Sequence, residues 1–134
     1  DHTNHITVAG AYVRATDEMS EMMGMLMTGA FMELTNNHDE SVTLIGGTCD
    51  CAEKVEIHEV VGGVMQLKEG GLEIAGGATE ALKPGGNHVM LIGLDEDLVA
   101  GTEVTFTLEF SDGHTVEVTA PVKVVNLDQE EYEN

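Results

Sequence analysis

The sequence predicts an all-β domain, built as an antiparallel sandwich or barrel. Short runs rich in β-branched and aromatic residues recur along the chain, with glycine, asparagine and aspartate between them. The run that contains Val104, Phe106 and Leu108 alternates these apolar residues with Thr105 and Thr107, as expected for a half-buried strand. The tetrapeptide SDGH that follows this run is typical of a hairpin turn.

Applied along the chain, the same pattern gives eight strands and one segment without a clear periodicity. The expected strands are residues 6–16, 29–36, 41–47, 54–60, 64–67, 88–94, 103–110 and 115–125. We predict a loop, with room for one helical turn, over residues 17–28, where Gly24 interrupts the spacing. We predict a single domain over residues 1–134, with flexible ends at 1–5 and 126–134.

The composition excludes several classes of partner. The 134 residues carry a net charge of -20, with five Lys and Arg against 25 Asp and Glu, whereas nucleic acids and anionic membranes require positive charge. No apolar run is long enough to insert in a membrane. The chain starts at Asp1 without the basic and apolar regions of a signal peptide, so we expect any export signal to have been removed already. We also expect a monomer.

Soft and borderline metal ligands are unevenly placed. The chain holds eight methionines and six histidines. In "VEIHEVVGGVMQL" the two glycines suit a tight hairpin turn, which would place Met65 diagonally across from His58, about 7 Å away at the backbone. His88 and Met90, two residues apart in a predicted strand, share a face. Two imidazoles and two thioethers favour Cu(I) over hard cations.

These residues carry a resemblance to a known family. "VEIHEVVGGVMQLKEGGLEIAGG" and "LKPGGNHVMLIGL" closely resemble the extracytoplasmic copper chaperones called PCu(A)C, and "AYVRAT", "GAFMELTN", "TFTLEFSDG" and "VTAPV" extend the likeness over residues 9–124. The resemblance maps the family's ligands onto His58, Met65, His88 and Met90. It departs from the family in a shorter gap between the first His and Met.

The resemblance implies a cupredoxin-like Greek-key β-barrel that binds Cu(I) outside the cytoplasm, in the periplasm or at the cell surface, and catalyses no reaction. It implies transfer of the copper to a partner, such as the copper centre of cytochrome oxidase or another copper chaperone. Two alternatives remain open: a copper-buffering or resistance protein, and a β-sandwich interaction module that binds no metal. A thiol-active enzyme that uses Cys49 and Cys51 is a further rival.

Two other groups of soft ligands are candidates for a secondary metal site. Met19, Met22, Met23 and Met25 fit a loose copper-capturing segment as well as they fit a cover for the barrel, whereas Met27 and Met32 are expected to pack inward. Cys49 and Cys51 suggest a disulfide in an exported protein, yet a bridge across one residue departs from ordinary geometry. On an extended chain both sulfurs would point the same way, which suits metal binding or an intermolecular bond.

Overall fold

The computed structural model describes residues 6–16, 21–22, 25–95 and 98–124, and this part of the chain is all β, with no helix. The predicted flexible ends lie outside it. The strands are β1 (Ile6–Arg14), β2 (Glu21–Met22), β3 (Met25–Asn36), β4 (Val42–Cys49), β5 (Ala52–Val61), β6 (Val64–Leu67), β7 (Leu72–Ile74), β8 (Thr79–Leu82), β9 (His88–Leu94), β10 (Glu103–Phe110) and β11 (Thr115–Lys123).

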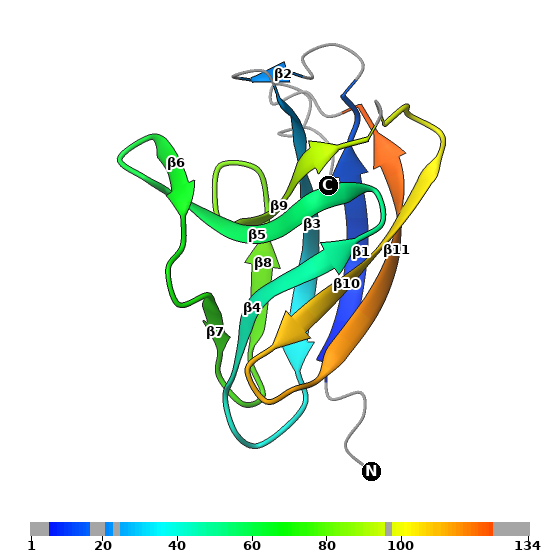
Figure 1. The fold of residues 1–134 in the computed structure, drawn as a ribbon. Helices are drawn as coiled ribbons and strands as arrows, with labels where there is room; N and C mark the ends of the chain where they lie inside the picture. Colours follow the sequence, from blue (N-terminus) through cyan, green and yellow to red (C-terminus); the bar gives the residue numbers. More distant parts are fainter. Residues whose placement is uncertain (1–5, 17–20, 23–24, 96–97, 125–134) are drawn as a thin grey trace.

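The strands form one sheet that closes on itself. Its order is β6-β5-β9-β3-β1-β11-β10-β4-β7, and an additional pairing of β5 with β4 closes the barrel (Figure 1). Only one of the described pairings is parallel, that of β1 with β11, where Val13 faces Val122. The hairpin between β10 and β11 turns at the predicted SDG sequence, so the prediction of an antiparallel barrel is confirmed.

The prediction of a loop over residues 17–28 is wrong for its second half. Residues 25–28 belong to β3, and Glu21–Met22 pairs back onto Met25 and Leu26 as a short hairpin. The reason is tertiary, because Met27 and Thr28 pair with Ile92 and Leu91 of β9, a partner that local spacing cannot reveal. The strands β7 and β8 were also missed. Each has four residues or fewer, too short to show an alternation.

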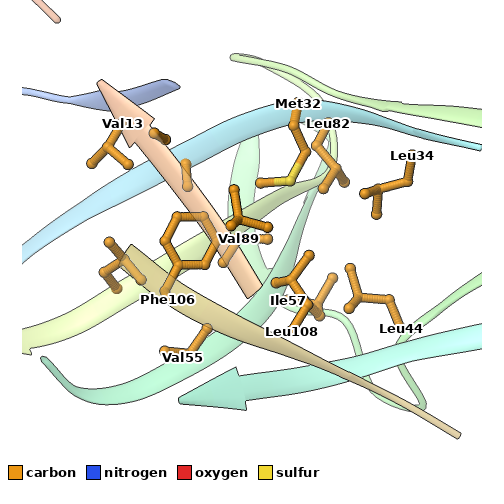
Figure 2. Close-up of a cluster of buried hydrophobic side chains, with 14 of the residues drawn as sticks. Val13, Met32, Leu34, Leu44, Val55, Ile57, Leu82, Val89, Phe106 and Leu108 are labelled. Atoms are coloured by element: carbon orange, nitrogen blue, oxygen red, sulfur yellow. The ribbon is translucent and has the colours of Figure 1, made fainter. Parts of the chain in front are cut away.

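The core fills the barrel interior with aliphatic side chains and two phenylalanines. Phe106 and Leu108 of β10 are almost fully buried, as their alternation predicted. From the opposite wall, Val89 and Ile57 extend into the same cluster, together with Met32 (Figure 2). Met32 therefore packs inward as expected, and β9 contributes Val89, Leu91 and Leu94 to the core.

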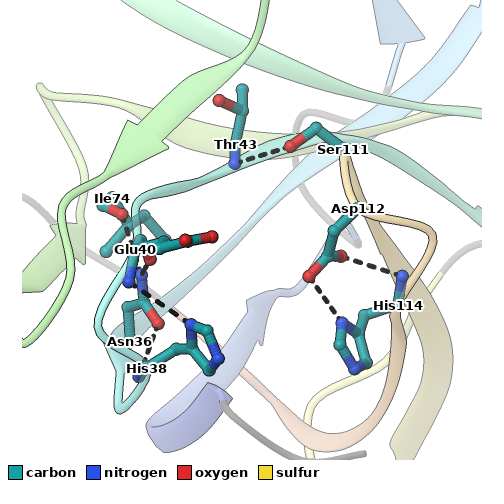
Figure 3. Close-up of polar contacts among 8 residues, drawn as sticks. All are labelled: Asn36, His38, Glu40, Thr43, Ile74, Ser111, Asp112 and His114. Atoms are coloured by element: carbon teal, nitrogen blue, oxygen red, sulfur yellow. Dashed lines mark hydrogen bonds and ion pairs between the residues drawn. The ribbon is translucent and has the colours of Figure 1, made fainter. Parts of the chain in front are cut away.

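One buried polar side chain ties the β3–β4 loop to the end of β7. Asn36 is fully buried, and its Nδ2 donates to the carbonyl oxygens of Glu40 (2.9 Å) and Ile74 (3.0 Å). Its Oδ1 accepts the backbone N–H of His38 (2.9 Å). On the neighbouring hairpin, Asp112 binds the ring of His114 (Figure 3). These three bonds supply the buried amide of Asn36 with the partners that it needs.

We expect Asn36→Asp to destabilise the protein by about 2–4 kcal/mol, since it removes two donors and buries a carboxylate beside carbonyl oxygens. Asn37→Asp is the matched control, because Asn37 is exposed and donates to the exposed Thr7 hydroxyl. Chemical denaturation at pH 7 measures both variants. Equal stabilities for the two variants would contradict the role assigned to Asn36.

Candidate metal centre

The first half of the candidate centre is the hairpin of β5 and β6. Gly62 and Gly63 turn it with φ of 60° and 82°, the left-handed values that a two-residue turn requires. Val60 pairs with Met65 and His58 pairs with Leu67, which is the register expected from the sequence. His58 and Met65 therefore lie on one face as diagonal neighbours.

The second half comes from β9, which lies between β3 and β5. His58 of β5 pairs directly with His88 of β9. Because side chains alternate along a strand, Val89 and Leu91 enter the core while His88 and Met90 take the other face. That face is covered here, since His88 is 5% and Met90 4% exposed. The structure brings the two His-Met pairs onto one face of adjacent strands.

The closest contact in this group joins an imidazole to a thioether. Nε2 of His88 lies 3.1 Å from Sδ of Met65. Nδ1 of His88 is 2.8 Å from the carbonyl oxygen of Gly86, which can only accept, so Nδ1 carries the proton and Nε2 of the neutral ring carries a lone pair. A thioether has no proton either. Two lone pairs therefore face one another, and a cation bound by both atoms would remove their repulsion.

His58 also holds a nitrogen ready for a metal. Its Nε2 lies 3.0 Å from a carboxylate oxygen of Glu56, so Nε2–H donates to Glu56 in the neutral ring. Nδ1 then has the lone pair. This Nδ1 is buried, and no hydrogen bond to it exists within the described residues, a costly arrangement unless another partner binds there. A carboxylate behind a ligating imidazole is the usual support in metal sites.

Aromatic rings border the two histidines. The ring centroids of His58 and His88 are 6.1 Å apart, and Phe31 of β3 lies 6.1 Å from His88 on the other side. Gly29 makes room for this ring, because a Cβ there would be 2.9 Å from Phe31. Sequence reasoning missed Glu56 and Phe31. The signal for Glu56 was its position two residues before His58, on the same strand face.

Burial controls the charge of His88. Desolvation lowers the pKa of this imidazole from its ordinary value, an effect that the nearby His58 reinforces and the hydrogen bond to Gly86 opposes. The neutral ring is the form that ligates a metal. The surroundings of His88 therefore hold it in the binding form at neutral pH.

The β5–β6 hairpin stands out from the barrel and carries Met65 to the surface (Figure 1). Met65 is 44% exposed, and its neighbours Val61, Val64 and Leu67 are also exposed. Residues 60–67 include no charged side chain. On a chain with a net charge of -20, this uncharged tip adjoins the candidate metal ligands.

The structure describes only part of the predicted secondary ligand set. Met19 and Met23 lie outside the described residues, and Met22 and Met25 belong to the β2–β3 hairpin. The expectation that Cys49 and Cys51 bind metal or another chain is corrected, because the two sulfurs form a disulfide with each other. A turn at Asp50–Cys51 brings the two Cα atoms to 5.0 Å, where an extended chain would have kept the sulfurs apart.

In the described part of the chain, no three His, Cys, Asp or Glu side chains are grouped so that they could hold a metal ion. The converging set at His88 is instead of mixed type, with imidazole and thioether. The described residues also include no helix long and apolar enough to cross a membrane.

Residues 6–122 match the family described as "Putative lipoprotein LpqE-like". The chain belongs to the LpqE-like family. A relative from Leifsonia xyli subsp. xyli, named "Putative lipoprotein Lxx21020", is 36% identical over 131 residues, which cover 95% of this chain and 75% of the relative. The names of the family and of this relative describe lipoproteins.

Solved structures of copper proteins share this fold. The Cu(I)-bound form of DR1885 from Deinococcus radiodurans is 31% identical, with a TM-score of 0.71 over 91% of this chain and 80% of that one. The copper-bound PCuAC domain of PmoF2 is 20% identical, with a TM-score of 0.73 over 93% and 97% of the two chains, and it shows the fold alone. The expected PCu(A)C-type barrel is confirmed.

We expect His88 to titrate below pH 6.5 in the metal-free protein, because burial lowers its pKa. The unfolded chain then binds more protons between the two pKa values, so this contribution to stability is complete above about pH 6.5 and is lost as the pH falls below it. Proton NMR titration measures the pKa, with His88→Ala to assign the signal. A midpoint at or above 6.5 would contradict the effect of burial.

Proposed function

We propose that this LpqE-like protein is an extracytoplasmic copper chaperone that binds Cu(I) through His58, Met65, His88 and Met90. The observation that carries the proposal is the contact of 3.1 Å between Nε2 of His88 and Sδ of Met65, two atoms that have lone pairs and no proton between them. A cation between them turns this unfavourable pairing into coordination. Thioether sulfur selects a soft ion, and Cu(I) is the soft ion of biological imidazole and thioether sites.

The similarity to the Cu(I)-bound DR1885 structure supports the choice of metal. The lipoprotein names of the family and of the Leifsonia relative support a place outside the cytoplasm. The role that we propose for this centre is carriage of the ion.

The geometry favours release to another protein over permanent storage. His88 and Met90 are buried on a strand held from both sides, whereas Met65 is exposed at the tip of a protruding hairpin. An incoming ligand can therefore replace Met65 first while the imidazoles still hold the ion. The uncharged tip lets a partner approach with little electrostatic repulsion from the acidic chain. We propose the copper centre of a terminal oxidase, or another copper chaperone, as the recipient.

The direct test is an anaerobic Cu(I) titration against a chromophoric chelator. We expect wild type to bind one ion, His88→Ala to lose tight binding, and Met65→Leu to bind at least about tenfold more weakly, equivalent to about 1.4 kcal/mol. Met32→Leu is the matched control, because it also removes one thioether, but from the core. Wild-type affinity in Met65→Leu, or equal losses in both methionine variants, would overturn the assigned site.

A second prediction concerns the carboxylate behind His58. We expect Glu56→Ala to weaken Cu(I) binding about 10-fold to 100-fold, since the ring loses the acceptor that fixes its tautomer. Glu59→Ala is the control on the same strand, where Glu59 binds Gln66 and Lys68 instead. Competition titrations of both variants measure the effect. An affinity in Glu56→Ala equal to that in Glu59→Ala would remove Glu56 from the site.

A further inference from the structure

The disulfide of Cys49 and Cys51 lies apart from the candidate copper centre. It is at the turn between β4 and β5, at the opposite end of β5 from the protruding hairpin (Figure 1). The cysteines are separated by Asp50 alone, so the bond closes a loop of three residues. Because the entropic stabilisation from a disulfide grows with the length of its loop, a loop this short stabilises the fold least.

Other interactions hold the turn in place. Cys49 pairs with Ala52 across the β4–β5 hairpin, and the backbone N–H of Asp95 donates to the carbonyl oxygen of Cys51 (3.1 Å). These bonds do not depend on the sulfur bridge. The bridge can therefore open while the two sulfurs stay within one turn.

The polar partners of Cys49 suit a reduced sulfur. The backbone N–H of Cys51 points at Sγ of Cys49 over 3.1 Å, and such a donor stabilises negative charge on a thiolate. The carbonyl oxygen of Thr105 lies 3.4 Å from the same Sγ. It cannot bind the sulfur of a disulfide by a hydrogen bond, but it can accept one from a thiol. Both protonation states of reduced Cys49 thus have a partner in position.

The turn is also accessible to a cation. Both cysteines are only partly buried, and Asp50 between them is exposed, as is Asp95 beside Cys51. With a net charge of -20, the chain raises the local concentration of cations. Carboxylates and water suit Cu(II), the oxidised form of the metal, better than thioethers do.

We propose that Cys49 and Cys51 are a redox-active pair that reduces Cu(II) to Cu(I). Two thiols give up two protons and two electrons and form one sulfur–sulfur bond, while each of two Cu(II) ions takes one electron and becomes Cu(I). The structure then shows the oxidised product of this step. A dithiol donor returns the pair to the reduced state by exchange, in which the donor becomes the disulfide.

This activity would supply the oxidation state that the His58–Met65–His88–Met90 site prefers. Only the fate of the Cu(I) rests on the proposed function, because the reduction itself takes place at the other end of β5. Experiments can therefore disprove the reduction of Cu(II) and the binding of Cu(I) independently.

The test begins with protein reduced by dithiothreitol and freed of it anaerobically. Cu(II) is then added with excess bicinchoninate, whose Cu(I) complex is coloured. We expect two Cu(I) ions per chain to form as two thiols are lost, and His88→Ala to give the same yield. Two controls should give only background: the oxidised wild type, which needs no substitution, and the Cys49→Ser/Cys51→Ser double variant.

Three results would overturn the proposal. One is a Cu(I) yield from reduced wild type equal to that from oxidised wild type. Another is copper bound with both thiols still free, which would make the pair a second binding site instead of a reductant. The third is a disulfide that dithiothreitol opens only when the protein unfolds, as judged by circular dichroism, which would assign the bridge a structural role. Loss of Cu(I) retention in the oxidised protein would instead count against the proposed chaperone function and leave this step intact.

Discussion

The pairing of β9 with β3 on one side and β5 on the other fixes both the core and the candidate metal ligands of this protein. A strand held along both edges cannot twist or slip without breaking two ladders, so its alternation of faces is fixed. One face completes the core through Val89 and Leu91, and the other presents His88 and Met90. A slip of β9 by one residue would turn the imidazole of His88 into the core and leave the outer face without this ligand. The positions of His88 and Met90 are therefore fixed together with the core.

The two sides of the centre differ in rigidity for a physical reason. The imidazole of His88 is fixed by its strand, by the Gly86 carbonyl and by the neighbouring ring of Phe31. Met65, in contrast, lies on a short strand at the edge of the sheet, with an unbranched side chain that adapts to its surroundings. The proposed copper carrier needs a rigid side that keeps the ion and an adaptable side that releases it. The fold places these two sides on β9 and β6, the two strands that flank β5.

Sequence alone could predict the β5–β6 hairpin and the buried face of β10, because the signals for both are local. The two glycines after Val61 define a tight turn, and a tight turn fixes which residues of its strands lie opposite. The alternation in β10 likewise follows from its own residues. The features that escaped prediction depend on distant partners. Residues 27 and 28 became strand because β9 pairs with them, and Glu56 became a partner of His58 only once the side chains were placed. The Cys49–Cys51 bond requires a turn at Asp50, whereas the prediction for these two cysteines assumed an extended chain.

The parallel pairing of β1 with β11 has a consequence for how the protein folds. It joins the first and last described strands of the chain, with Val13 opposite Val122. Contacts between such distant segments form slowly, because the chain must lose the entropy of a long loop before the contact repays it. The barrel therefore cannot close until almost the whole chain is available. A nascent or truncated chain without β11 leaves β1 with an open edge, and open edges are where β proteins associate with the wrong strand.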